Sequence, residues 1–77
     1  MTVKRILIGN DHDDSKWVVL SALADGAPAC CEVRRSINTA ALVDGTESLA
    51  THKAELEVVA EEYHARWLAV QAEIDSL

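Results

Sequence analysis

Apolar residues recur at helical spacing through the last third of the chain, residues 46–77, which contains neither Gly nor Pro. This pattern predicts one uninterrupted amphipathic helix. With a rise of about 1.5 Å per residue, the helix would be about 46 Å long, whereas strands of about six or seven residues span only about 20 Å. We therefore expect the helix to project beyond any sheet that the rest of the chain can form.

Within this helix the apolar positions form a seam in which steps of four and three residues alternate. The seam consists of Leu56, Ala60, Tyr63, Trp67, Val70, Ile74 and Leu77. Such alternation is typical of a helix that packs against another helix. The first half can cover a sheet, but the part from Trp67 onward has no candidate partner in the chain. We expect an interface between two copies, formed as an antiparallel two-fold contact because isologous dimers are the commonest assembly. Its residues would be Tyr63, Trp67, Val70, Ile74 and Leu77.

The first half of the chain carries the shorter patterns of β-strands. Residues 3–8 are mostly β-branched or aliphatic, and residues 9–15 form a polar run that favours a loop. Residues 17–24 are the strongest strand candidate, and Asp25-Gly26 after them favours a type I′ hairpin. The return strand is expected over residues 29–35, so the three strands would form an antiparallel meander.

Both faces of the middle strand are apolar, which predicts a cover on each face of the sheet. One cover is the long helix, and the other would be a short helix, a second copy or a different protein. We expect the short helix over residues 38–43, capped by Ser36 and ended by Asp44-Gly45. Thr46 would then cap the long helix. The predicted fold is one α+β domain over residues 1–77, with a three-stranded antiparallel meander, a short helix and one long C-terminal helix packed on the sheet.

A chain of 77 residues buries only about 60% of the surface that its unfolded form exposes, so its core is marginal. Disulfides, metals or partner subunits usually stabilise such small folds. The two cysteines, Cys30 and Cys31, are adjacent, which is a poor geometry for a bridge within the chain. Metal binding and self-association therefore remain as the ways in which this small core could be stabilised.

The formal net charge of −6 is concentrated on the long helix, because residues 46–77 hold seven Asp/Glu and two Lys/Arg. A phosphate backbone would be repelled there, so direct nucleic-acid binding is not expected. The same charge supports an alternative function, an acidic decoy that imitates nucleic acid and binds a basic protein. Its phosphate substitutes would be Glu55, Glu61, Glu62, Glu73 and Asp75.

The apolar run near the N-terminus, residues 6–8, is too short for a signal-peptide core or a membrane span. We therefore expect a cytoplasmic protein without a membrane partner, and reduced adjacent thiols fit that compartment.

Three groups of residues are candidates for chemistry, and each has a simpler interpretation. His12 with Asp11, Asp13 and Asp14 can supply cation ligands or form a solvated loop. Glu57, Glu61 and His64 share a helix face and can bind metal or form an acidic surface. Cys30 near Arg34 can be a reactive thiol, while Cys31 fits a small core position. Because no catalytic, cofactor-binding or zinc pattern occurs, we expect no catalytic residue, no cofactor and no bound metal.

Several of these patterns resemble a known family when they are taken together. They are Lys16-Trp17-Val18-Val19-Leu20, Asp25-Gly26, Cys31-x-Val33, Ala41-Leu42, and Leu49-x-x-His52-Lys53-x-x-Leu56-x-x-x-Ala60-x-x-Tyr63. Across residues 13–65 the chain resembles the small bacterial domain of unknown function 1488 family. The family's Ser or Thr before the short helix is replaced by Arg34, and residues 66–77 extend beyond the resemblance. The resemblance implies a small α+β fold and carries over no functional residue.

The expected function is a non-enzymatic, cytoplasmic protein–protein interaction module that forms a homodimer and binds another, unidentified protein.

Overall fold

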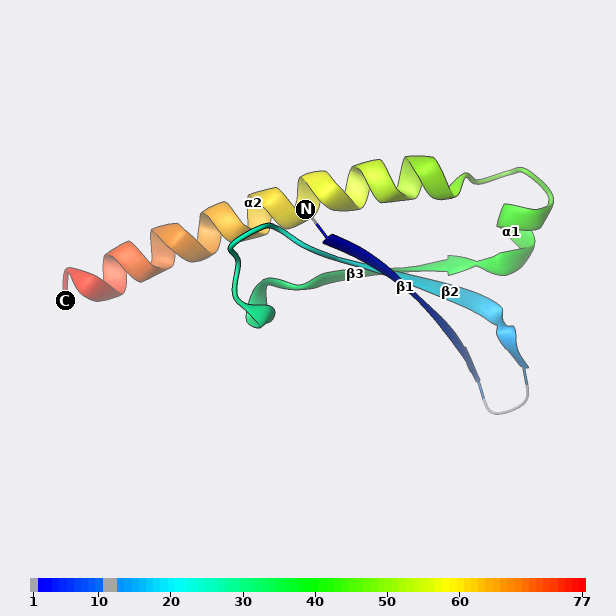
Figure 1. Ribbon diagram of the computed structural model, residues 1–77, viewed down its shortest axis with the longest axis horizontal. Coiled ribbons are helices and arrows are strands. Elements are labelled where there is room, and N and C mark those ends of the chain that lie inside the picture. Colours follow the sequence, from blue (N-terminus) through cyan, green and yellow to red (C-terminus); the bar gives the residue numbers. More distant parts are fainter. Residues whose placement is uncertain (1, 11–12) are drawn as a thin grey trace.

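Helix α2 lies along one face of an antiparallel sheet in this computed structural model, which describes residues 2–10 and 13–77 (Figure 1). The strands are β1 (Thr2–Asn10), β2 (Asp13–Leu23) and β3 (Val33–Asn38), in the order β1-β2-β3. The register of the central strand pairs Val18 with Leu7 on one side and with Ile37 on the other.

Three helical segments complete the described chain. They are the 3-10 helix η1 (Ala29–Cys31), the short helix α1 (Thr39–Val43) and the long helix α2 (Leu49–Asp75). The α+β class, with an antiparallel sheet, a short helix and a long C-terminal helix, is therefore confirmed.

The core lies between the sheet and the N-terminal half of α2. Its buried cluster is formed by Val18, Leu20, Ala22, Ile37, Leu56 and Ala60. Alternate residues of a strand point to the same side, so Val18, Leu20 and Ala22 of β2 all lie on the face that meets the helix. Leu42 of α1 packs against the same cluster. Both helices therefore cover the same face of the sheet.

The opposite face of β2 carries Trp17, Val19 and Leu23. Trp17 is 40% exposed. Val19 is buried, and the register of the sheet pairs it with Ile6 of β1 and Ser36 of β3. No helix of the described chain packs on this side, so the short helix is not the second cover, and a cover by a second copy or a different protein stays a prediction.

The region between β2 and β3 differs from the prediction. The expected third strand over residues 29–35 is displaced, because residues 29–31 form η1 and β3 begins at Val33.

The turn after β2 is closed by a hydrogen bond of 3.0 Å from the Ala27 N–H to the Ala24 carbonyl. Gly26 has a φ of 81°, and Asp25 is not among the residues with positive φ. The type I′ prediction was therefore wrong, because that turn needs positive φ at both central residues.

Both helix caps also lie elsewhere than predicted. The Asn38 side chain, rather than Ser36, caps α1 by accepting from the Ala40 N–H at 2.8 Å. The cap position of α2 is Ser48, rather than Thr46. The loop expected over residues 9–15 is shorter than predicted, since β1 extends to Asn10 and β2 begins at Asp13.

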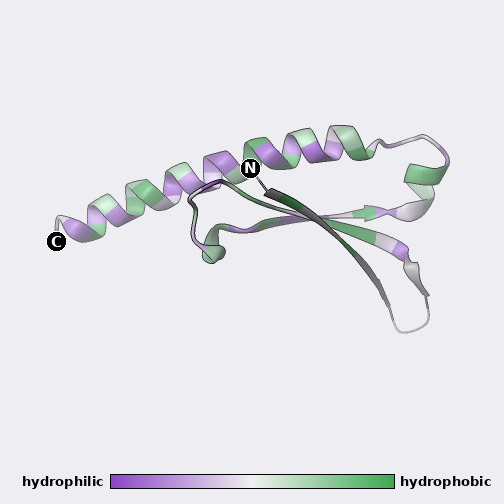
Figure 2. Cartoon of the chain, in the orientation of Figure 1, coloured by the Kyte–Doolittle hydropathy of each residue, from purple (hydrophilic) through white to green (hydrophobic). Residues whose placement is uncertain are grey.

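The C-terminal half of α2 projects past the end of the sheet (Figure 1). The helix has 27 residues, and the longest dimension of the described chain is 50 Å. Apolar positions continue along the projecting half, beyond the segment that packs on the sheet (Figure 2). The apolar surface of α2 is thus longer than the sheet that covers it.

Replacing Leu56 by Ala should destabilise the fold, because this side chain is 2% exposed and joins α2 to the sheet. We expect a loss of about 2–5 kcal/mol in the free energy of unfolding, measured by urea denaturation. Val58→Ala is the matched control on the same helix, since Val58 is 57% exposed, and it should change stability by less than about 0.5 kcal/mol. Similar losses for the two variants would contradict this packing.

Candidate functional site

The projecting half of α2 carries four of the five residues predicted for an interface, and Leu77 follows two residues after its end. Successive residues of a helix are rotated by about 100°, so the row that starts at the buried Leu56 and Ala60 continues through the five. Tyr63, Val70 and Ile74 are 47%, 48% and 51% exposed, and Leu77 is fully exposed, whereas Trp67 is half-buried. We call Tyr63, Trp67, Val70, Ile74 and Leu77 the apolar stripe. The same helix face is thus buried under the sheet at one end and open at the other.

A hollow of about 270 Å³ opens on this stripe. It is lined by Tyr63, Arg66, Trp67 and Val70. The ring of His64 approaches that of Trp67 with 6.2 Å between centroids and a tilt of 35°. Arg66 was not among the predicted interface residues. Its position three residues after Tyr63, next to the seam, is the feature of the sequence that identifies it.

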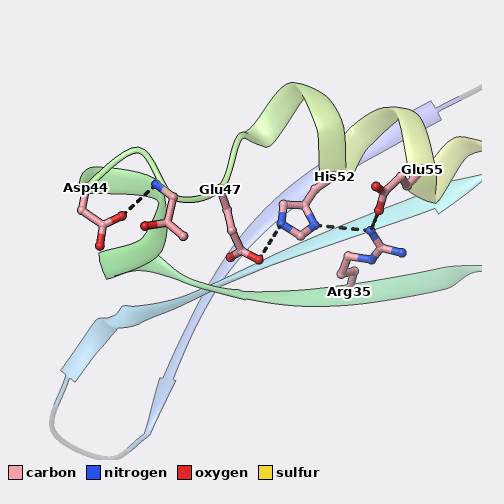
Figure 3. A network of polar contacts seen from close by, with 6 residues as sticks. Arg35, Asp44, Glu47, His52 and Glu55 are labelled. Carbon is pink, nitrogen blue, oxygen red and sulfur yellow. Dashed lines mark hydrogen bonds and ion pairs between the residues drawn. The ribbon is translucent and has the colours of Figure 1, made fainter.

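A polar network joins the first turns of α2 to β3 (Figure 3). Arg35 Nη1 donates to Glu55 Oε2 at 2.5 Å and lies 3.3 Å from His52 Nδ1. Because a guanidinium only donates, a hydrogen bond between these two groups requires Nδ1 as the acceptor. His52 Nε2 lies 3.4 Å from Glu47 Oε1. The imidazole of His52 and the carboxylates of Glu47 and Glu55 all have partners within the network. The network therefore ties α2 to the sheet.

The turn between α1 and α2 is held by a carboxylate. Asp44 Oδ1 accepts from the Thr46 N–H at 2.8 Å, and Gly45 has a φ of 84°. The hydrogen bonds with Thr46 lower the pKa of Asp44 below its usual range, because they favour the charged form.

The two groups considered as possible metal ligands have different outcomes. The first falls outside the described part of the structure, which leaves out His12 and Asp11 and does not describe the side chains of Asp13 and Asp14. In the second, Glu57 Oε1 lies 3.9 Å from Lys53 Nζ and Glu61 is exposed. Among the described residues, no three His, Cys, Asp or Glu side chains are arranged to hold a metal ion.

The cysteines lie in η1, rather than in a strand as predicted. Cys31 is fully buried, as expected for a small core residue, and Cys30 is exposed. Burial raises the pKa of the Cys31 thiol, and the neighbouring Cys30 raises it further. The Arg34 guanidinium pairs with Glu32, with 2.7 Å between Nε and Oε1, so it has a partner other than the Cys30 thiol.

No helix in the described residues is long and apolar enough to cross a membrane. Comparison with known proteins finds no matching family model, no matching curated protein and no matching solved structure.

The two thiols should differ sharply in reactivity. We expect iodoacetamide to alkylate one cysteine of the folded protein rapidly and both in denaturant, as counted by intact mass. The reason is that Cys30 is exposed, whereas Cys31 is buried and its raised pKa reduces the thiolate fraction. Cys30→Ser should remove the rapid reaction. Rapid double labelling of the folded protein would contradict the burial of Cys31.

The contribution of Asp44 to stability should depend on pH. Because its pKa is lowered by folding, the stabilisation is present above the usual Asp pKa of about 3.9. It is lost as the pH falls through the lower pKa of the folded state. Asp44→Ala should therefore lower the urea midpoint at pH 7, and the difference from the unchanged protein should shrink in acid. A difference that stays constant with pH would count against this carboxylate interaction.

Proposed function

We propose that this protein is a non-enzymatic interaction module that works as a homodimer, with two copies pairing through the apolar stripe of α2. The observation that carries the proposal is the continuation of a buried helix face into an open one. Leu56 and Ala60 are 2% and 0% exposed, whereas Ile74 in the same row is 51% exposed.

The energy available from this stripe is large for so small a chain. Burying a large apolar side chain contributes about 1.5–3 kcal/mol, and a typical domain has a total stability of about 5–15 kcal/mol. Trp67, Val70 and Ile74 are already partly buried, so pairing adds part of this contribution for these three, and it adds the whole contribution for Leu77. A second copy supplies the same surface, as a two-fold interface requires.

The acidic decoy is the second candidate, and the exposed side chains of Glu55, Glu61, Glu62, Glu73 and Asp75 favour it. These charges are divided between the two sides of the stripe, with Glu61 and Asp75 on one side and Glu62 and Glu73 on the other. Glu55 already pairs with Arg35. The five charges lie on both sides of the stripe, whereas Tyr63, Trp67, Val70, Ile74 and Leu77 follow one row, although Leu68 is also exposed off that row. The continuous row gives the apolar module more support.

The proposed compartment is the cytoplasm of a bacterial cell. The bacterial source rests on the resemblance to the domain of unknown function 1488 family. The cytoplasmic setting is supported by Cys30 and Cys31, which carry free thiols of a kind that reducing compartments preserve. Further binding to a different protein would then be a property of the assembled pair.

Charge placed on the stripe should separate the two copies. We expect sedimentation equilibrium to show a dimer for the unchanged protein at micromolar concentration, and a monomer for Trp67→Glu and for Val70→Glu. A buried unpaired carboxylate at the interface is costly, while the helix itself should persist in circular dichroism. Val58→Glu, on an exposed position away from the stripe, is the control and should remain dimeric. A monomeric unchanged protein at micromolar concentration would contradict the proposal.

A further inference from the structure

We infer that the two copies pair antiparallel in one register, with Val70 of each copy seated in the hollow of the other and Arg66 beside the partner's Glu73. This inference rests on the proposed dimer and deepens it. It assigns the residues that determine orientation and partner choice, whereas the apolar stripe alone would permit several arrangements.

The shape of the hollow is the first argument. Its lining residues, Tyr63, Arg66, Trp67 and Val70, occupy positions i, i+3, i+4 and i+7 of the helix. Four residues at these positions form the hole that receives one side chain of a facing helix in knobs-into-holes packing. An isolated chain thus already presents a hole for a helical partner.

The register of the seam identifies the side chain that fills this hole. In an antiparallel pair, the two alternating seam positions face each other, so Trp67 lies opposite the partner's Val70 and Tyr63 opposite the partner's Ile74, or the pair is shifted by one heptad. The shifted registers would bring Arg66 against Arg66 or Glu73 against Glu73, so the flanking charges favour the first register. The partner's Val70 then projects between Arg66 and Trp67, at the middle of the hollow. By symmetry the same insertion occurs twice.

Charge complementarity is the second, independent argument. Arg66 and Glu73 lie on one flank of the seam, seven residues apart, and His64 and Gln71 lie on the other flank. In an antiparallel pair like flanks meet, so each Arg66 faces the partner's Glu73 and two ion pairs form. In a parallel pair unlike flanks meet, and Arg66 would face the partner's neutral Gln71. Flanking charges of this kind set the orientation of paired helices.

The position of the sheet also excludes the parallel arrangement. The sheet covers the row through Leu56 and Ala60, and the helical period puts the stripe on the same side of α2. A parallel partner would bring its own sheet to the same level and the same side, where the two sheets would overlap. An antiparallel partner places the two sheets at opposite ends of the helix pair.

The size of the contact sets the conditions for a test. Each copy contributes only the five side chains of the stripe and their flanks, so we expect the pair to bury less than the roughly 1,200–2,000 Å² of standard interfaces. We therefore expect micromolar affinity, within reach of sedimentation equilibrium.

Reciprocal charge reversal tests the register directly. Arg66→Glu puts two acidic groups at each contact, and Glu73→Arg puts two basic groups there, so each variant alone should dimerise about tenfold more weakly or worse. An equimolar mixture of the two should form a heterodimer about as strong as the original homodimer, because both of its contacts are then opposite in charge. The double variant Arg66→Glu/Glu73→Arg should likewise recover.

Glu61→Arg is the matched control for Glu73→Arg, since it makes the same acidic-to-basic reversal at an exposed position off the seam, and it should not weaken dimerisation in this way. The losses should shrink in about 1 M salt, where charges are screened beyond about 3 Å. An unchanged protein that dimerises, combined with variants that show no loss or no recovery on mixing, would overturn this register and leave the proposed function standing. A monomeric unchanged protein would overturn both.

Discussion

The structure depends on the contact between the sheet and the N-terminal half of α2, because the buried cluster of the described residues lies there. Leu56 and Ala60 of α2 pack on Val18, Leu20 and Ala22 of β2. The Arg35 network adds a second tie between the same two layers. This contact fixes the rotation of α2 about its axis. Since the helix is continuous to Asp75, it also fixes the direction in which the distant stripe points.

The long helix could be predicted from the sequence, because apolar positions at a 3.6-residue period without Gly or Pro determine a helix locally. Its start could not. Thr46 is a good cap residue by type, but its N–H is taken by the Asp44 carboxylate in the preceding turn, and α2 begins only after Ser48. The third strand was misplaced for a similar reason. A hydrogen bond of 2.9 Å from the Cys31 N–H to the Pro28 carbonyl closes a local turn that hydrophobicity does not reveal.

The candidate site shows the same division between local and non-local information. The stripe follows from the spacing along one helix, so its residues could be named before the structure was known. The hole around Arg66 requires real side-chain positions, although its spacing is already present in the sequence. The polar network could not be predicted in this way, since Arg35 contacts His52 and Glu55, which lie 17 and 20 positions further along the chain. That contact depends on which face of β3 meets α2, and residue types alone do not determine it.

The charge of the projecting helix makes orientation matter. Each copy has a net charge of −6, so two copies repel each other at long range, and apolar burial must offset that repulsion. Arg66 is the single Lys or Arg after Lys53. An arrangement that places it opposite a neutral group therefore gains no electrostatic attraction between the two helices. Salt screens the overall repulsion and the Arg66–Glu73 attraction together, and these two effects on affinity have opposite signs. The affinity of the unchanged pair should therefore depend weakly on salt even though charge decides its register, which distinguishes it from a decoy held to a basic protein by charge alone.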